Sequence, residues 1–111
     1  MIVSPKEVLD FWFEECEPSD WFKKSEAFDN EIRTRFLETY EAIMSGDTAE
    51  WRKSAHGRLA EIIVLDQFAR NMFRDDAKAF AADELAVELA KEVLPYWDEF
   101  SIQERSFVVM P

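Results

Sequence analysis

Cysteine and histidine are almost absent from this sequence, because each occurs only once, as Cys16 and His56. A single cysteine cannot form an intramolecular disulfide, and one residue of each kind cannot assemble a Cys/His zinc site within one chain. Glu14, Glu15 and Glu17 flank Cys16, so we expect the pKa of its thiol to be raised and its nucleophilicity to be low. The sequence therefore predicts no metal site, and no cofactor is indicated.

Glycine and proline are also scarce, with two and four residues among 111. So few turn-forming residues favour long helices over many short strands. The chain has no glycine-rich loop to bind phosphate and no nucleophile-elbow pattern around a serine. Its hydrophobic fraction of 48% is ample for a packed core, and its length predicts a single domain over residues 1–111.

Positively charged residues are few: the chain has 13 lysines and arginines and 24 acidic residues, which gives a net charge of −11. Such a chain repels nucleic acid and anionic membranes, so neither is an expected partner. No apolar run approaches the ~20 residues that a membrane span needs, and no signal peptide is visible. We therefore expect a cytoplasmic protein.

Helical periodicity is present in most of the chain, with apolar residues recurring every three or four positions. Ser4 is a suitable N-cap, Gly46 follows a helix end, and the pairs Asp47/Glu50 and Ser101/Glu104 are typical of capping boxes. The predicted helices cover residues 4–13, 26–45, 58–73, 76–94 and 101–109, with a short helix around Trp51. No strand is predicted. The pattern favours an all-α, antiparallel helical array that is compatible with a tetratricopeptide-repeat-like superhelix, although no 34-residue repeat is present.

Charged residues lie on the buried faces of three predicted helices. On a helical wheel, Asp66 and Arg70 fall among the apolar residues of helix 58–73. Asp29 and Arg33 lie within the apolar arc of helix 26–45, and Asp83 lies within that of helix 76–94. We expect these side chains to point into the protein, because apolar residues surround them.

These charges predict a polar cluster between helices, because a buried lone charge costs several kcal/mol and must be paired. Arginine can bind carboxylates from two helices, while Gln67, Asn71 and Arg74 can complete the network. One interpretation is an ion-pair network that fixes the register of the helices. The other is an arginine-lined pocket for a carboxylate or phosphate, or an acid/base pair. A cavity beside the cluster would favour the second interpretation.

Two kinds of function are compatible with this cluster. The first hypothesis is a non-catalytic binding module that recognises a peptide or a small anionic ligand at the Arg70/Arg74 groove. The second is a hydrolase-type enzyme that uses Asp66 or Asp83 as its acid/base. A purely structural interaction protein is a further alternative.

The aromatic residues Trp12, Trp21 and Phe22 favour a place in the core over a stacking platform, because aromatic side chains dominate core energetics.

Several motifs resemble those of the bacterial family known as domain of unknown function 924. They are VLDFWF (8–13), WFKKSEAFDNEIRTRF (21–36), GRLAEIIVLDQFARNMFRDDAKAFAAD (57–83) and ERSFVVMP (104–111). The resemblance implies an all-α, tetratricopeptide-repeat-like fold and brings no established activity, substrate or cofactor. The positions that match its motifs are Trp12, Trp21, Phe22, Asp29, Asp66, Gln67, Arg70, Asn71, Arg74, Asp83, Arg105 and Pro111.

The sequence departs from this resemblance at its C-terminus, where family members continue with a His-Ser-Glu segment and further helices. Loss of that histidine would weigh against an enzyme. We expect the shortened array to expose an apolar end around Phe107, Val108 and Val109, and to cover it by self-association as a homo-oligomer.

Overall fold

The computed structural model describes residues 2–21, 25–74 and 76–110. Within these ranges the backbone forms helices and no strand, so the predicted all-α fold class is confirmed. None of the described helices is both long and apolar enough to cross a membrane. The α-helices are α1 (Pro5–Asp10), α2 (Glu26–Met44), α3 (Ala55–Ile63), α4 (Ala69–Met72), α5 (Asp83–Val93) and α6 (Ile102–Val109). Between them lie the π-helical turns Phe11–Glu15 and Val64–Phe68 and the 3-10 segments Pro18–Asp20, Ala49–Lys53, Ala77–Phe80 and Leu94–Glu99.

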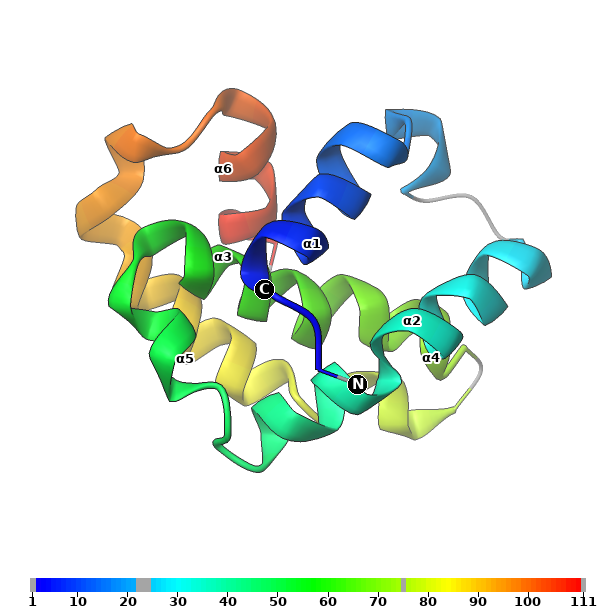
Figure 1. Cartoon of the computed structure of the whole chain (residues 1–111). Coiled ribbons are helices and arrows are strands. Elements are labelled where there is room, and N and C mark those ends of the chain that lie inside the picture. The colour runs from blue at the N-terminus through cyan, green and yellow to red at the C-terminus, as the bar shows by residue number, and fades with distance from the viewer. Residues whose placement is uncertain (1, 22–24, 75, 111) are drawn as a thin grey trace.

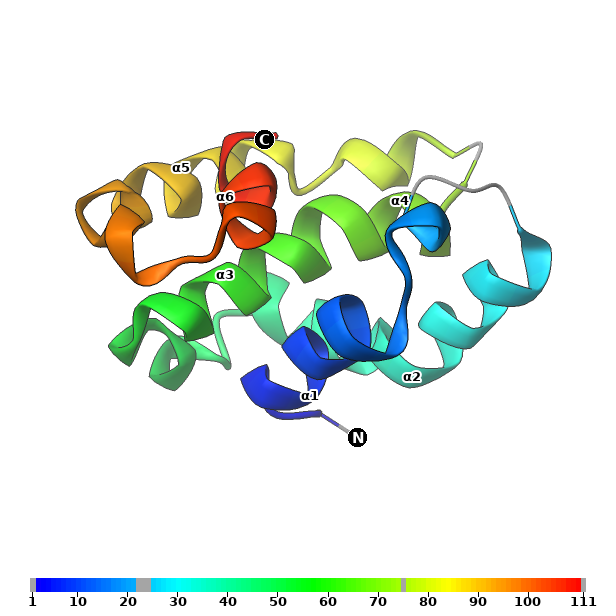
Figure 2. The same ribbon diagram turned by 90° about the horizontal axis from the view of Figure 1, so that it is seen from above.

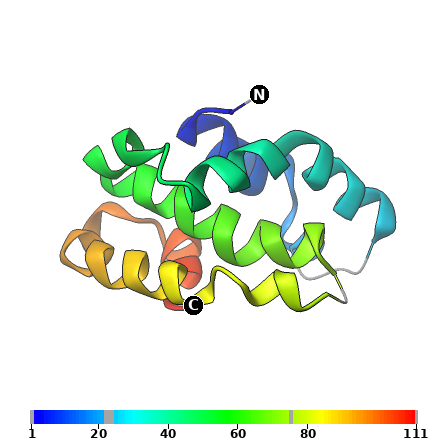
Figure 3. The same ribbon diagram turned by 90° about the horizontal axis from the view of Figure 1, so that it is seen from below.

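A central helix is formed by α3, the π-helical turn Val64–Phe68 and α4, which follow one another without a break. Figures 1 and 2 show this helix between α2 and α5, with α1 and α6 against its first half. The view from below in Figure 3 shows the same order of α2, central helix and α5. Contacts agree with this arrangement, because α5 packs on α3, α2 packs on α4, and α1 and α6 both contact α3.

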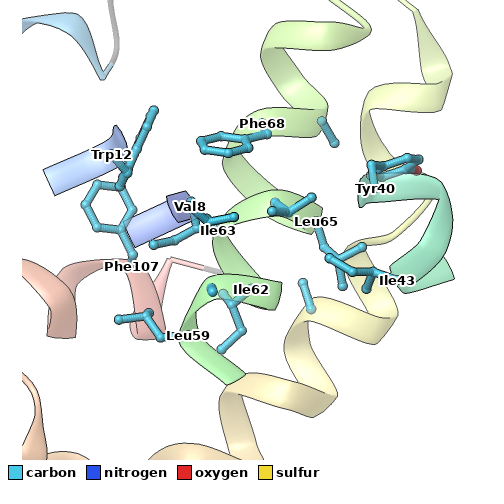
Figure 4. Close-up of a cluster of buried hydrophobic side chains, with 14 of the residues drawn as sticks. Val8, Trp12, Tyr40, Ile43, Leu59, Ile62, Ile63, Leu65, Phe68 and Phe107 are labelled. Atoms are coloured by element: carbon cyan, nitrogen blue, oxygen red, sulfur yellow. The ribbon is translucent and has the colours of Figure 1, made fainter. Parts of the chain in front are cut away.

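The hydrophobic core surrounds the central helix, which is apolar on more than one side. In Figure 4, Trp12 and Phe107 lie on one side of this helix, while Tyr40 and Ile43 of α2 lie on the other. Each residue from Leu59 to Ala69 is buried. This segment is therefore packed by neighbours on all sides, as expected for a helix that is apolar on more than one face.

The π-helical turn changes which residues face the core beyond Phe68. The backbone N–H of Ala69 donates to the carbonyl oxygen of Val64, a bond to the fifth residue back instead of the fourth. This turn holds one more residue than an α-helical turn, so the residues after it are rotated by roughly 100° relative to a regular helix. Arg70 was predicted to point into the protein, but its side chain is 44% exposed. The prediction was wrong because it assumed one regular helix over residues 58–73.

Helix starts are marked by serine caps in the way the sequence predicts. The Ser4 hydroxyl oxygen accepts a hydrogen bond from the backbone N–H of Glu7 at 3.2 Å. Ser101 and Glu104 form a complete capping box at the start of α6. Each cap satisfies a backbone donor that the first turn leaves without an intrahelical partner.

The end of α2 is closed around Gly46, whose φ of +82° suits the position after a helix. Its N–H donates to Ile43, and the N–H of Asp47 donates to Ala42, which together satisfy two carbonyl oxygens of the last turn. The capping box predicted for Asp47 is wrong, because the following 3-10 segment is Ala49–Lys53 and its N-cap position falls on Thr48. Asp47 is used to close the preceding helix instead.

The helix predicted over residues 76–94 is interrupted in the structure. A 3-10 segment, Ala77–Phe80, comes first, and α5 starts only at Asp83. Two acids, Asp83 and Glu84, occupy the first turn of α5, where carboxylates interact favourably with the helix dipole. Phe80 and Leu94, which the predicted helix included, lie outside α5, and both are exposed.

The C-terminal apolar end is smaller than predicted. Phe107 and Val108 are buried against the core, whereas Ile102, Val109 and Met110 are exposed. Since α6 packs on α3 and α5, only its outer side remains open. Self-association through this end stays a prediction.

Cys16 is buried, and burial raises the pKa of its thiol to about 12, with Asp20 and Glu15 adding to the shift. The prediction of a raised pKa is confirmed, although burial contributes more than the neighbouring acids. The thiol is therefore almost entirely protonated near neutral pH and is a weak nucleophile.

Gly57 lies in the first turn of α3, whereas the predicted helix started one residue later, at residue 58. Ser54 caps this helix by accepting a hydrogen bond from the N–H of Gly57 at 2.9 Å. A Cβ atom at position 57 would lie only 1.9 Å from the carbonyl oxygen of Trp51. Glycine is required here because another segment of backbone occupies the space of a side chain.

We predict that Gly57→Ala lowers the free energy of unfolding by about 3 kcal/mol or more, because backbone atoms must move to relieve the overlap. Gly46→Ala is the control, since its added Cβ meets no atom within 4 Å and only the positive φ is unfavourable. We expect that change to cost about 1 kcal/mol. Urea unfolding of both variants measures the difference, and equal losses would contradict the role of Trp51.

Candidate functional site

The first polar group of the site joins the start of α2 to the end of the central helix through Asp29. Its carboxylate accepts two hydrogen bonds from Arg74, at 2.6 Å from Nε and 3.0 Å from Nη2. Asn71 Nδ2 donates to the same carboxylate at 2.8 Å. This two-point contact with a guanidinium is a strong, directional interaction that holds α2 against α4.

The second polar group is formed around Asp66, which lies in the π-helical turn and is 1% exposed. One carboxylate oxygen is 2.9 Å from Arg70 Nη2, and the other accepts a hydrogen bond from Gln67 Nε2 at 2.8 Å. Burial raises the pKa of Asp66, an effect that Arg70 and Gln67 oppose and the charge of Asp83 reinforces. Removal of the carboxylate from water therefore outweighs its favourable contacts.

Asp83 reaches this second group from another helix. It is the first residue of α5, not part of the buried face that the sequence predicted, and its side chain is partly exposed. Its Oδ1 atom is nevertheless buried and has no hydrogen-bond donor among the described residues. Arg70 Nη2 lies 4.0 Å from that oxygen, so one guanidinium nitrogen faces carboxylates from two helices.

Arg33 does not join either group in the way the sequence suggested. It is exposed, and its Nη1 atom donates to the carbonyl oxygen of Met72 at 3.0 Å. The guanidinium lies 5.7 Å from the ring centre of Phe73. Because long side chains can run along apolar surface to reach water, its place on the apolar arc of α2 did not require burial.

Two of the pockets beside the polar groups include both Arg70 and Arg74. One has a volume of about 270 Å³ and is also lined by Trp21, Gln67, Asn71 and Met110. We call it the amide pocket, after Gln67 and Asn71. The other, of about 450 Å³, is bordered by the 3-10 segment Ala77–Phe80. The cavity that the sequence analysis named as evidence for a site is therefore present.

The aromatic residues Trp12 and Trp21 stack in the core, with ring centres 5.9 Å apart. Trp21 Nε1 donates to the carbonyl oxygen of Trp12 at 2.8 Å, which fixes the ring of Trp21 beside the amide pocket. The Nε1 atom of Trp12 is buried and has no acceptor among the described residues. Phe22, the third predicted aromatic residue, lies outside the described residues.

Sequence reasoning missed a second buried acid, Glu61, which is on α3. Its carboxylate accepts a hydrogen bond from Thr48 Oγ1 at 3.0 Å and another from Arg52 Nε at 3.2 Å. The available signal was an acid within the apolar run RLAEIIV. Since both partners come from the connection before α3, this group holds that connection against the helix.

His56 was also left out of the predicted site. Its Nε2 atom is 3.3 Å from Glu104 Oε2, and both residues line a separate pocket of about 370 Å³. The other oxygen of Glu104 is already used to cap α6. Among the described parts of the chain, no three His, Cys, Asp or Glu side chains lie close enough to hold a metal ion.

Comparison with known proteins places the chain in a family. The model of the family described as "Bacterial protein of unknown function (DUF924)" matches residues 8–111. The chain belongs to this family. It is also similar to a solved structure, "Structure of Protein of Unknown Function ATU0120 from Agrobacterium tumefaciens", with 34% identity and a TM-score of 0.88. The similarity covers 94% of this chain and 60% of that one, so the chain spans less than two thirds of the length of the solved protein.

No curated protein matches the chain. The DUF924 assignment confirms the resemblance seen in the sequence, and neither description includes an activity.

We predict that Asp29→Ala lowers the free energy of unfolding by about 2 kcal/mol, because it leaves Arg74 and Asn71 without their shared acceptor. The loss is smaller than for a deeply buried pair, since Arg74 is partly exposed. Asp10→Ala is the control, because Asp10 pairs with Lys6 on the surface. We expect that change to cost about 0.5 kcal/mol or less. Urea unfolding compares them, and equal losses would contradict a structural role for Asp29.

We predict that Asp66→Asn changes the pH dependence of stability. Because the folded-state pKa of Asp66 is raised, the folded protein binds this proton more tightly than the unfolded chain. The wild type therefore loses stability as pH rises from the ordinary carboxyl pKa through the raised value. The amide of the variant does not titrate, so the variant should gain stability relative to the wild type over that interval. Urea unfolding at a series of pH values tests this, and a difference that falls with rising pH would contradict it.

Proposed function

We propose that this protein is a non-catalytic, helical-repeat-like binding module that takes the carboxylate of a small ligand at Arg70. The observation that supports it is the availability of the donors on the Arg70 guanidinium. Its closest approach to both carboxylates is through Nη2, and none of its nitrogens makes a hydrogen bond to a described residue. The side chain is 44% exposed and borders both pockets of the site.

Arginine suits this role because its planar fork of donors matches the two oxygens of a carboxylate. Arg70 is better placed for it than its neighbours. Arg74 uses Nε and Nη2 on Asp29, and Arg33 donates to a backbone carbonyl oxygen. A ligand carboxylate can therefore be held by Arg70 while the Asp29 group keeps the helices in register.

The size of the pockets favours a small ligand over a long peptide. Sites for drug-sized molecules typically measure about 300–1,000 Å³. The two pockets beside Arg70 measure about 270 and 450 Å³. As part of the same proposal we place the binding in the cytoplasm, because the buried free thiol of Cys16 suits a reducing compartment.

A hydrolase that uses Asp66 is the second candidate, and the raised pKa of its carboxyl is the observation that favours it. A general acid or base must reach the proton that it transfers. Asp66 is nearly inaccessible, and it is not among the side chains that line either pocket beside Arg70. Asp83 is more open, but it lines a different pocket, of about 680 Å³, whose lining includes neither Arg70 nor Arg74. Binding is therefore the better-supported function.

We predict that Arg70→Gln weakens the binding of acetate at least tenfold, because it removes the charged donors while keeping much of the side-chain length. Arg70→Lys should weaken it less, since the charge remains but the fork of donors is lost. A ¹H–¹⁵N NMR titration with sodium acetate at constant ionic strength measures the affinities.

Arg35→Gln is the matched control, because Arg35 is also partly exposed and ion-paired but belongs to neither pocket. Its acetate affinity should equal that of the wild type. Equal weakening by Arg35→Gln and Arg70→Gln would show a general charge effect and would contradict a site at Arg70.

A further inference from the structure

The orientation of two amide side chains in the amide pocket is fixed by carboxylates. Gln67 Nε2 donates to Asp66, and Asn71 Nδ2 donates to Asp29, both at 2.8 Å. A carboxylate accepts hydrogen bonds and does not donate them, so each amide must turn its nitrogen toward the acid. The amide oxygens, Gln67 Oε1 and Asn71 Oδ1, therefore point away from the carboxylates that hold the amide nitrogens.

These two oxygens have no hydrogen-bond donor among the described residues, although Gln67 and Asn71 are each only 6% exposed. Neither oxygen is among the fully buried side-chain atoms that lack a partner, so both keep surface that a ligand can reach. Both residues line the amide pocket. They are four positions apart, which places them on the same side of the helix one turn from each other.

The amide pocket therefore combines acceptors and donors. Arg70 lies between Gln67 and Asn71 in the sequence and lines the same pocket, so one pocket holds both guanidinium donors and amide acceptors. A ligand that satisfies both needs a carboxylate for Arg70 and a group with several N–H donors for the amides. A carboxylate alone leaves the two oxygens without partners.

We propose that the ligand of this pocket is a free α-amino acid, held by its carboxylate at Arg70 and by its ammonium group at Gln67 Oε1 and Asn71 Oδ1. This inference rests on the proposed function, because it needs the carboxylate to bind at Arg70. It adds an ammonium group to the carboxylate ligand of that proposal. An ammonium group has three donors, enough to serve both amide oxygens at once.

The charge of the protein supports a zwitterion over a simple anion. A chain with a net charge of −11 repels phosphate and other multiply charged anions at long range. An amino acid with an uncharged side chain has no net charge and avoids this repulsion. Its ammonium group is also favoured by the acids behind the amides, Asp29 and Asp66.

The remaining lining residues indicate an apolar side chain on the amino acid. Trp21 and Met110 complete the amide pocket, and the ring of Trp21 is fixed by its hydrogen bond to Trp12. An immobile aromatic ring is a favourable surface for another ring or an aliphatic chain. The volume of about 270 Å³ suits a single amino acid better than a peptide.

Three related molecules separate the parts of this inference: L-phenylalanine, 3-phenylpropanoate, which lacks the amino group, and 2-phenylethylamine, which lacks the carboxylate. Isothermal titration calorimetry of the full chain measures the affinity for each. We expect L-phenylalanine to bind at least tenfold more tightly than either of the others. Chemical shifts of the side-chain amides of Gln67 and Asn71 in ¹H–¹⁵N NMR spectra should move with L-phenylalanine.

Gln67→Met tests the amide directly, because it keeps the length of the side chain and removes the oxygen. The variant should bind L-phenylalanine with an affinity close to that for 3-phenylpropanoate. Its affinity for 3-phenylpropanoate should stay within about twofold of the wild-type value. Gln103→Met, at an exposed position of α6, is the matched control and should change neither affinity. A thermal melt by circular dichroism confirms that each variant is folded.

The outcomes distinguish this inference from the proposed function. Equal affinities of the wild type for L-phenylalanine and 3-phenylpropanoate would overturn the amino-acid inference and leave carboxylate binding at Arg70 intact. Tighter binding of 2-phenylethylamine than of both carboxylates would overturn both. If none of the three binds while acetate binding still depends on Arg70, the amino-acid inference fails alone.

Discussion

The structure depends on the pairing of carboxylates in the nearly dry surroundings of the central helix. A charge removed from water is unfavourable unless a partner compensates it, so each acid there determines where its neighbours must lie. Asp29 draws Arg74 and Asn71 to α2, and Arg70 lies between Asp66 of the central helix and Asp83 of α5. The positions of two flanking helices are thereby tied to side chains of a single helix.

The two polar groups differ in how many of their hydrogen-bond donors and acceptors are paired. The fully paired group supports the fold, and the incompletely paired group is the one available to bind a ligand. Asp29 receives three well-directed hydrogen bonds from Arg74 and Asn71. Around Asp66, the arginine is partly exposed, and Oδ1 of Asp83 has no hydrogen-bond donor among the described residues. Groups left with spare donors and acceptors beside a cavity are where a ligand gains most on binding.

The sequence was sufficient for the fold class and for most members of the polar groups, because apolar periodicity and unpaired charges are local signals. Asp66, Gln67 and Asn71 were placed correctly, since each is a polar residue in a stretch that is otherwise apolar. Arg70 was misplaced because the hydrogen bond that widens the turn at Val64–Phe68 leaves no mark in residue type. The division of the cluster into two groups, and the missed Glu61, depend on which helices pack together, and one helical wheel does not contain that information.

The π-helical turn also constrains how this chain can vary in length. Asp66 lies inside the turn, while Arg70 and Arg74 follow it. Deletion of a single residue between Val64 and Phe68 would remove the extra residue, so ordinary α-helical bonding could resume with the residues that follow still on their present faces. Arg74 could then still reach Asp29, and Asn71 could stay in the pocket. The central helix can therefore lose one residue inside this turn, whereas deletion of one residue elsewhere in it would rotate all that follows.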